Sequence, residues 1–217
     1  VIPNKNKPCS MKDMDSLLAQ VLAFRPNRLV PPFDLQGHIP FVAWLVKELQ
    51  PATFVQLGTQ SGNLYFAACQ TVAENSLPTR CWAVGTWQAE ELAQCHSVQQ
   101  EAGASDYNRQ HFGAFSGLLR MGDAQALPRF APGSIDLLLI DGRYSPETVR
   151  NEYESWRDRL SDHAVVLLVG IEQADSGAAA LWQQLQPQYP HLAFAHAQGL
   201  GVLAVGGNVP KAFQQAL

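Results

Sequence analysis

The stretch Thr53-Phe-Val-Gln-Leu-Gly-Thr-Gln-Ser-Gly-Asn63 constrains the fold of this chain more than any other part of the sequence. Residues 53–57 form an apolar, partly β-branched run, which predicts a buried strand. Gly58 and Gly62 then bracket a turn, and apolar residues recur at helical spacing from Leu64 onward. A strand, a glycine turn and a helix are the first half of a parallel β-α-β unit. Because glycines let a ligand approach the backbone, and the first N–H groups of the helix face the same space, this turn is a candidate binding site.

The rest of the chain repeats this alternation. Further strands are predicted at about 81–87, 118–121, 135–140, 164–169, 191–196 and 201–205, and helices at about 63–74, 88–102, 107–115, 146–160 and 178–189. The 135–140 run is almost wholly apolar, as in a central strand buried on both faces. The last two strands are joined by so few residues that they must pair antiparallel. We therefore expect a Rossmann-like α/β fold, with a seven-stranded, mostly parallel sheet, an antiparallel last strand and helices on both faces.

Residues 1–36 are predicted to form an N-terminal extension, and residues 37–217 the main domain. Ser10-Met-Lys-Asp13 resembles a capping box, and apolar residues follow it on one helical face, so the extension should contain one helix. Residues 25–36 carry three prolines and are predicted to be extended. A second helix should open at Gly37-His-Ile-Pro-Phe41 and end at Pro51. The missing initial Met suggests a processed chain or a piece of a longer one.

The composition argues against several classes of protein. A net charge of −4 without a concentrated Lys/Arg patch disfavours a nucleic-acid-binding surface. No apolar run approaches the roughly 20 residues of a membrane span, and the first ten residues lack the apolar core of a signal peptide. The four cysteines are scattered and contain no CxxC pair, which is typical of reduced thiols. We expect a cytoplasmic protein of 217 residues without a membrane span.

Other site motifs fit the sequence poorly. The glycines of Gly58-Thr-Gln-Ser-Gly62 are separated by three residues, unlike the GxGxxG of dinucleotide-binding proteins or the GxSxG of hydrolases. A P-loop signature is absent. No three of the six histidines have metal-ligand spacing, and we predict no metal site. His38 opens a helix and is predicted to be a structural or pocket-lid residue rather than a base.

Six segments together resemble one enzyme family. They are Gly37-His-Ile-Pro-Phe41, Val55-Gln-Leu-Gly-Thr-Gln-Ser-Gly62, Ala83-Val-Gly-Thr-Trp-Gln88, Ile135-Asp-Leu-Leu-Leu-Ile-Asp-Gly142, Glu154-Ser-Trp156 and Gly199-Leu-Gly-Val-Leu-Ala-Val205. In this order and spacing the chain resembles the class I S-adenosylmethionine-dependent methyltransferases from about residue 37 to 205. More narrowly, it is similar to small methyltransferases associated with glycosyltransferases and surface-polysaccharide assembly. The resemblance implies S-adenosylmethionine as cofactor, and a saccharide acceptor or a glycosyltransferase domain as partner, and it leaves the oligomeric state open.

The resemblance also implies where the site lies, because in such folds the cofactor sits at the carboxyl ends of the strands. The implied cofactor-binding positions are Gln56, Gly58, Gln60, Gly62, Gly85, Trp87 and Asp123, and Asp141 and Tyr144 are the catalytic candidates. Trp87 could stack on a ligand. From the residues alone, Asp123 could instead cap a helix, and Asp141 could brace the turn before Ser145. Arg120 and Arg143 are the cations expected near the pocket, either solvated or binding an anionic sugar or phosphate.

The chain departs from the family at several of these positions. Acidic residues are usual where it has Gln56 and Gly85, and the second of these normally grips the ribose hydroxyls. Histidines are usual at Gln60 and Tyr144, and a His-Asp pair usually stands where Val169-Gly170 closes a strand. Each lost charge-assisted hydrogen bond is worth roughly 1.5–3 kcal/mol, and a missing general base roughly 10²–10⁴ in rate.

Two functional interpretations follow from these departures. The first is a degenerate methyltransferase domain, a pseudoenzyme with weakened or lost catalysis and a structural or interaction role in glycan assembly. The alternative is an active O-methyltransferase acting on a saccharide or related small acceptor, with a rearranged site built on Asp123, Asp141 and Tyr144.

Overall fold

The computed structural model describes residues 23–59, 61–86, 98–141 and 144–208, with the backbone alone for 98–102. Its strands are β1 (Thr53–Leu57), β2 (Arg80–Gly85), β3 (Ser116–Arg120), β4 (Ile135–Asp141), β5 (Leu160–Val169), β6 (His191–Phe194) and β7 (Leu200–Ala204). Its α-helices are α2 (Ile39–Leu49), α3 (Asn63–Glu74), α5 (Val98–His111), α6 (Asp123–Ala126), α7 (Pro146–Trp156) and α8 (Gly177–Leu185). Short 3₁₀ turns are η1 (Gln36–His38), η2 (Leu127–Arg129), η3 (Arg157–Arg159) and η4 (Gln186–Gln188). None of the described helices has both the length and the hydrophobicity to cross a bilayer.

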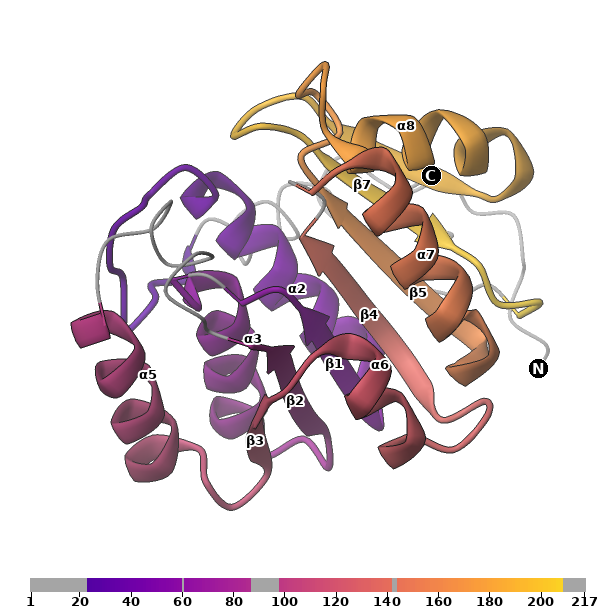
Figure 1. Ribbon diagram of the computed structural model, residues 1–217. Coiled ribbons are helices and arrows are strands. Elements are labelled where there is room, and N and C mark those ends of the chain that lie inside the picture. Colours follow the sequence, from indigo (N-terminus) through magenta and orange to yellow (C-terminus); the bar gives the residue numbers. More distant parts are fainter. Residues whose placement is uncertain (1–22, 60, 87–97, 142–143, 209–217) are drawn as a thin grey trace, which may run out of the picture.

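The strands form one sheet in the order β3-β2-β1-β4-β5-β7-β6 (Figure 1). The pairs from β3 across to β5 are all parallel, whereas β7 is antiparallel to both β5 and β6. The predicted seven-stranded, mostly parallel sheet with an antiparallel last strand is thus confirmed. The order of strands reverses between β1 and β4, and such a switch point opens a crevice at the carboxyl ends of the strands.

Helices cover both faces of the sheet and bury two hydrophobic cores. Helices α2, α3 and α5 lie on one face, and α6, α7 and α8 on the other (Figure 1). Alternate residues of β4 pack into different cores. Leu137 and Leu139 pack on the first face, and Leu138 and Ile140 pack on the second. This alternation explains why the strand is apolar throughout, as expected for a strand buried on both faces.

Local signals placed several boundaries correctly. Helix α3 begins at Asn63 and ends at Glu74, as predicted. Helix α7 begins at Pro146 because Ser145 caps it, with the Ser145 hydroxyl accepting a hydrogen bond from the Thr148 N–H. Helix α2 ends at Leu49, followed by Gln50 in the left-handed conformation, which agrees with the stop predicted at Pro51.

The sequence predicted two separate helices, at 88–102 and 107–115, and this separation was wrong. Residues 98–111 form the single helix α5, which runs through Gly103 and ends at His111. A glycine inside a helix costs only about 0.5–1 kcal/mol, and packing can outweigh it. Tyr107 packs edge-on against Phe66 of α3, with their ring centroids 5.2 Å apart. The part of the prediction at 88–97 lies outside the described residues.

Strand β5 begins at Leu160, four residues before the predicted start at Ala164. The polar Asp162 and His163 interrupt the apolar run, so hydrophobicity alone does not reveal this first part. The backbone nevertheless continues as strand, because Leu160 pairs with Ile135 across an irregularity in the β4–β5 ladder. Pairing with a neighbouring strand therefore extends β5 beyond its apolar core.

Residues 23–35, which we call the strap, lie along helix α3. The side chains of Asn63 and Gln70 on this helix hydrogen-bond to backbone groups of the strap between Arg25 and Pro32. Leu35, at the end of the strap, reaches the carboxyl edge of the sheet. The predicted helix in residues 10–22 lies outside the described residues, so the helical part of the predicted extension stays a prediction.

Candidate functional site

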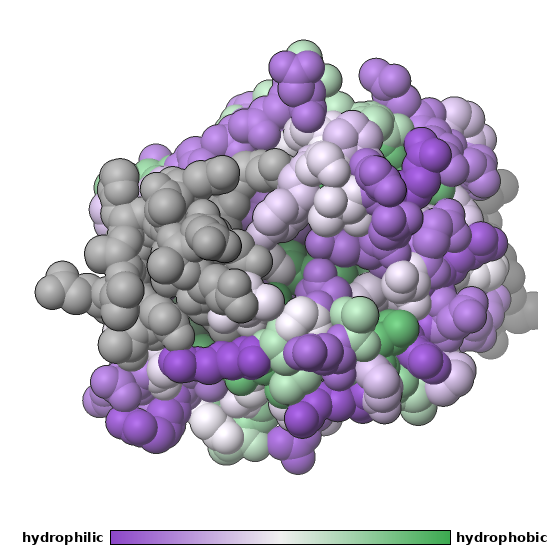
Figure 2. Space-filling view, viewed as in Figure 1, coloured by the Kyte–Doolittle hydropathy of each residue, from purple (hydrophilic) through white to green (hydrophobic). Residues whose placement is uncertain are grey.

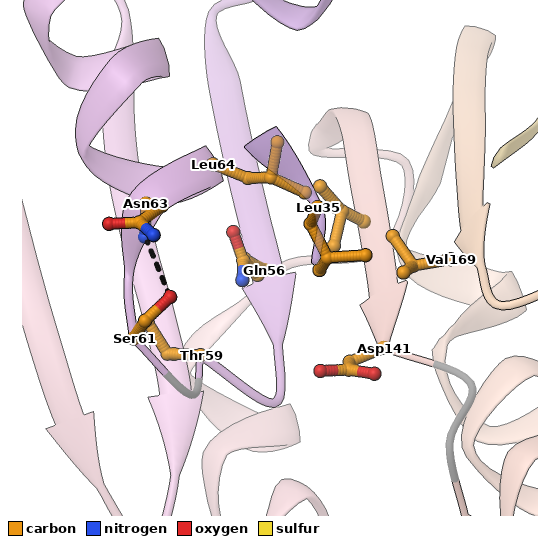
Figure 3. A pocket seen from close by; sticks show the side chains of 9 residues that line it. Leu35, Gln56, Thr59, Ser61, Asn63, Leu64, Asp141 and Val169 are labelled. Atoms are coloured by element: carbon orange, nitrogen blue, oxygen red, sulfur yellow. Dashed lines mark hydrogen bonds between the residues drawn. The ribbon is translucent and has the colours of Figure 1, made fainter. Parts of the chain in front are cut away.

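A pocket lies at the switch point of the sheet, where β1, β4 and β5 end (Figure 3). Its described lining residues are Leu35, Gln56, Thr59, Ser61, Asn63, Leu64, Leu139, Asp141 and Val169. Figure 2 shows a hollow beside the ends of these strands, with hydrophobic side chains at its base. The volume enclosed between the lining side chains is about 10 Å³, which holds one water-sized polar group rather than a nucleoside.

The turn at 58–62 is built from two glycines with positive φ. Gly58 has φ +71° and Gly62 has φ +74°, a conformation that other residues adopt only with strain. The Gly58 N–H donates to the Val84 carbonyl at 3.0 Å, which ties the turn to β2. A side chain at Gly58 would place its Cβ 3.1 Å from the Asp141 Cβ. The absence of a side chain therefore lets the end of β1 approach the end of β4.

Two polar atoms in this pocket lack a hydrogen-bond partner among the described residues. Gln56 is 4% exposed, and its Nε2 donates to the Gly58 carbonyl at 3.1 Å, but its Oε1 has no partner. The hydroxyl of Thr59, which is 8% exposed, is also without one. An unsatisfied buried polar atom costs roughly 1–3 kcal/mol. Both residues line the pocket, so a water molecule or a polar group of a ligand bound there would satisfy these atoms.

The two catalytic candidates both lie close to Gly58. Asp141 is the last residue of β4, is 4% exposed and lines the pocket. Tyr144 is 38% exposed, and its Cε2 would lie 3.7 Å from a Cβ at Gly58. The structure therefore brings a buried carboxylate and an exposed phenol to one point of the carboxyl edge. Their catalytic roles remain predictions.

Gly85 and Asp123 are two further positions that the resemblance implies for cofactor binding, and the structure describes both. Gly85 ends β2, and a Cβ there would have no atom of the described residues within 4 Å. Asp123 is the first residue of α6, whereas the N-cap is Gly122. The alternative interpretation of Asp123 as the cap is therefore wrong. Gln60, Trp87 and Arg143 lie outside the described residues.

The end of β5 carries no ionisable side chain. Val169 is fully buried and lines the pocket, and Gly170 has φ +94°. The Gly170 N–H donates to the Gly199 carbonyl at 2.9 Å, and the Gly170 carbonyl accepts from the Ser176 hydroxyl. This corner therefore supplies neither a general base nor a metal ligand. In the part of the chain that the structure describes, no group of His, Cys, Asp and Glu side chains could hold a metal ion.

Arg28 contacts the glycine turn, and the sequence had pointed only to Arg120 and Arg143 as cations near the pocket. The Arg28 Nη1 donates to the Ser61 carbonyl at 2.6 Å. Arg120 is exposed, and its Nη2 donates to the Ser105 hydroxyl at 2.8 Å. The expectation that Arg120 and Arg143 are the cations near the pocket was therefore incomplete. Arg28 lies 33 residues before Ser61 in a segment with no motif, so no local signal could have found it.

His38 is a buried structural residue, in agreement with its prediction as a structural or lid residue. It is 1% exposed, and its Nε2 contacts the Ala197 carbonyl at 3.0 Å. Because a carbonyl only accepts, Nε2 carries the proton, and Nδ1 has no hydrogen-bond partner among the described residues. Burial is the main cause that lowers the pKa of His38 to about 4, although its bond to Ala197 opposes that shift. The imidazole is therefore neutral at neutral pH.

The strand order, the glycine turn and the pocket together define a methyltransferase-like architecture of the Rossmann type. The family model described as a methyltransferase domain matches residues 55–168, more than half of the chain. The chain belongs to this family.

A relative from Sinorhizobium fredii, described as the uncharacterized protein y4gI, is 36% identical over 199 residues. The match covers 91% of this chain and 22% of the relative. This chain therefore spans little more than a fifth of the length of that relative.

Solved structures of methyltransferases share the fold. The S-adenosylhomocysteine-bound methyltransferase PaMTH1 of Podospora anserina aligns with a TM-score of 0.58 and 12% identity, covering 92% of this chain and 98% of that one. The O-methyltransferase TomG of Streptomyces achromogenes, in complex with S-adenosylmethionine, aligns with a TM-score of 0.54 and 14% identity, covering 88% and 89%. This chain thus has a fold that binds S-adenosylmethionine in other proteins.

Proposed function

We propose that this domain binds S-adenosylmethionine at the carboxyl edge of β1 and β4, and that its methyl-transfer activity is weakened or lost. The observation that carries the proposal is the buried, unsatisfied Oε1 of Gln56. S-adenosylmethionine, when bound, supplies a sulfonium methyl group for transfer to a nucleophile.

The described residues fit the amino-acid end of this cofactor. The Gln56 Oε1 can accept a hydrogen bond from an ammonium group, and the Thr59 hydroxyl can donate or accept.

The ribose end of the cofactor has weaker support. At Gly85, where the family usually has a carboxylate, no side chain is present to accept from two hydroxyls. Losing such a charge-assisted bond weakens affinity by roughly tenfold to 150-fold. At Val169 and Gly170 no base can take a proton from an acceptor, which supports slow transfer or none.

An active O-methyltransferase is the second candidate, and Asp141 favours it. Its carboxylate lines the pocket beside Gly58 and lies near Tyr144, so a base and a hydroxyl are available at one point. In this case Asp141 would accept the proton of the acceptor hydroxyl. The resemblance seen in the sequence supports a saccharide or related small acceptor in a glycan-assembly setting.

Calorimetric titration with S-adenosylhomocysteine tests the binding, and a tritiated-methyl assay with a panel of hydroxylated acceptors tests the transfer. We expect weak binding by the wild type, loss of binding in Gln56→Leu, and no change in Gln183→Leu, an exposed residue of α8. Binding without transfer supports the degenerate domain. Transfer at ordinary enzymatic rates would support the active enzyme, and no binding at millimolar ligand would refute both.

A further inference from the structure

The peptide between Ser61 and Gly62 is held at both ends. Its carbonyl oxygen accepts a hydrogen bond from Arg28 Nη1 at 2.6 Å. Its N–H, on Gly62, donates to the Thr59 carbonyl at 2.7 Å. Rotation of this peptide would break both bonds and would change the positive φ of Gly62. The orientation of one peptide in the glycine turn therefore depends on a side chain of the strap.

The guanidinium of Arg28 is well placed to hold this carbonyl. Its Cζ lies 4.8 Å from the centre of the Phe66 ring and 5.6 Å from that of Tyr107. Burial lowers the pKa of Arg28, and the nearby Tyr107 opposes that shift. No carboxylate forms an ion pair with Arg28 in the part of the chain described. The two rings stabilise the cation by cation–π contact, so its N–H groups remain available for the turn.

The strap fixes where Arg28 lies along helix α3. The Asn63 side chain accepts from the Val30 N–H at 3.1 Å and donates to the Val30 carbonyl at 2.7 Å. The Gln70 side chain accepts from the Asn27 N–H at 2.8 Å and donates to the Arg25 carbonyl at 3.0 Å. Both amides thus bind the strap backbone in a reciprocal way. Arg28 lies between these two attachment points, which prevents the strap from sliding along the helix.

We propose that Arg28 is a positioning residue for the methyl donor. It acts through the Ser61–Gly62 peptide, which sets the shape of the turn whose Thr59 and Ser61 side chains line the pocket. The inference rests on the proposed function, because the turn is where the donor is expected to bind. Arg28 is not among the residues that line the pocket, so its contribution to the site is made through the backbone of the turn.

The affinity for S-adenosylhomocysteine, measured by calorimetry, tests this role. Arg28→Met keeps the apolar stem but removes the donors, and it should weaken binding roughly tenfold to 100-fold. Arg28→Lys keeps the positive charge and N–H donors, without the planar fork of the guanidinium, and should restore part of the loss. The matched control is Arg80→Met, because Arg80 Nη1 also donates to a loop carbonyl, that of Ala114 at 2.8 Å, but at the other edge of the sheet. Equal affinity of Arg28→Met and wild type would overturn the proposal.

Amide hydrogen exchange in the cofactor-free proteins separates this inference from the proposed function. Exchange at the Gly62 N–H should be roughly tenfold faster in Arg28→Met than in wild type or Arg80→Met, while Phe66 in the following helix turn changes little. If the wild type does not bind S-adenosylhomocysteine, both the proposed function and the proposed effect of Arg28 on donor binding are refuted. Unchanged exchange at Gly62 would overturn the positioning role whatever the wild type binds.

Discussion

The two ends of strand β4 each carry a buried aspartate, Asp136 and Asp141, in different surroundings. At the amino end, Asp136 accepts from the backbone N–H groups of Ala52 at 2.7 Å and Thr53 at 3.2 Å, and it pairs with His163 at 3.0 Å. At the carboxyl end, Asp141 lies in a pocket with two unsatisfied polar atoms. The contacts of Asp136 lie within the protein, so the amino end should serve stability. We propose that a ligand binds at the carboxyl end, which should therefore serve function.

The largest expected effect is at the amino end. Asp136→Ala should lower the free energy of unfolding by about 3 kcal/mol, because two buried N–H groups lose their acceptor. Urea unfolding measures this, and Asp162→Ala is the control, because Asp162 is exposed and contacts the other nitrogen of His163. Ligand binding per folded molecule should stay unchanged. A loss of affinity in folded Asp136→Ala would contradict the division of roles between the two ends.

The next effect is a gain of affinity at the carboxyl end. Gly85→Asp should tighten S-adenosylhomocysteine binding by roughly tenfold to 100-fold, because it returns a carboxylate to a position where a side chain meets nothing within 4 Å. Gly85→Asn is the matched control, with the same shape but no charge. Calorimetry on the folded variants measures the difference. Equal affinities for the two variants would show that charge at this position is irrelevant to the ligand.

A smaller effect on stability should follow from filling the glycine turn. Gly58→Ala should lower the free energy of unfolding by about 1–2 kcal/mol, because φ is +71° and the new Cβ would lie 3.1 Å from Asp141. Gly85→Ala, in open space, should leave stability the same or slightly raise it. Thermal unfolding compares the two variants. The same destabilisation in both would mean that the close approach of β1 to β4 is not what requires Gly58.

Acid should destabilise the carboxyl edge first. Burial lowers the pKa of His38 from 6.5 to about 4, so between these values the unfolded chain binds the proton more readily. Stability should therefore be complete above pH 6.5 and fall by about 1–2 kcal/mol as the pH drops toward 4, allowing for solvent screening. His38→Gln should flatten this part of the unfolding curve.

The amino end should respond in a lower pH window. Hydrogen bonds from His163 and Asn208 lower the pKa of Asp162, so its contribution is present above the unfolded pKa and is lost as the pH falls through the folded one. In Asp162→Asn, the loss of stability in this lower pH window should disappear, whereas the loss caused by His38 should remain. A single transition in wild type that neither variant alters would contradict the assignment of the two windows.

The fold could be predicted from the sequence in most of its parts, because its signals are local. The apolar run at 53–57, the positive-φ glycines and the Ser145-Pro146 cap each specify a boundary through neighbouring residues. The prediction of two helices in place of α5 was wrong, because residues 103–106 continue the helix and Tyr107 packs on Phe66 of α3. Of the candidate site, the sequence predicted the glycine turn through the family resemblance. It did not predict the side chain of Arg28 that contacts this turn.

By itself, the sequence determined the alternation of strands and helices, the glycine turn and the antiparallel last strand, because each depends on residues close together in the chain. Only the tertiary structure decided that Arg28 holds the turn and that Asp136 closes the amino end of β4. Arg28 contacts Ser61 from 33 residues away, and Asp136 contacts Ala52 from 84. Such contacts arise from the packing of the whole sheet and its helices, and no pattern within one segment specifies them.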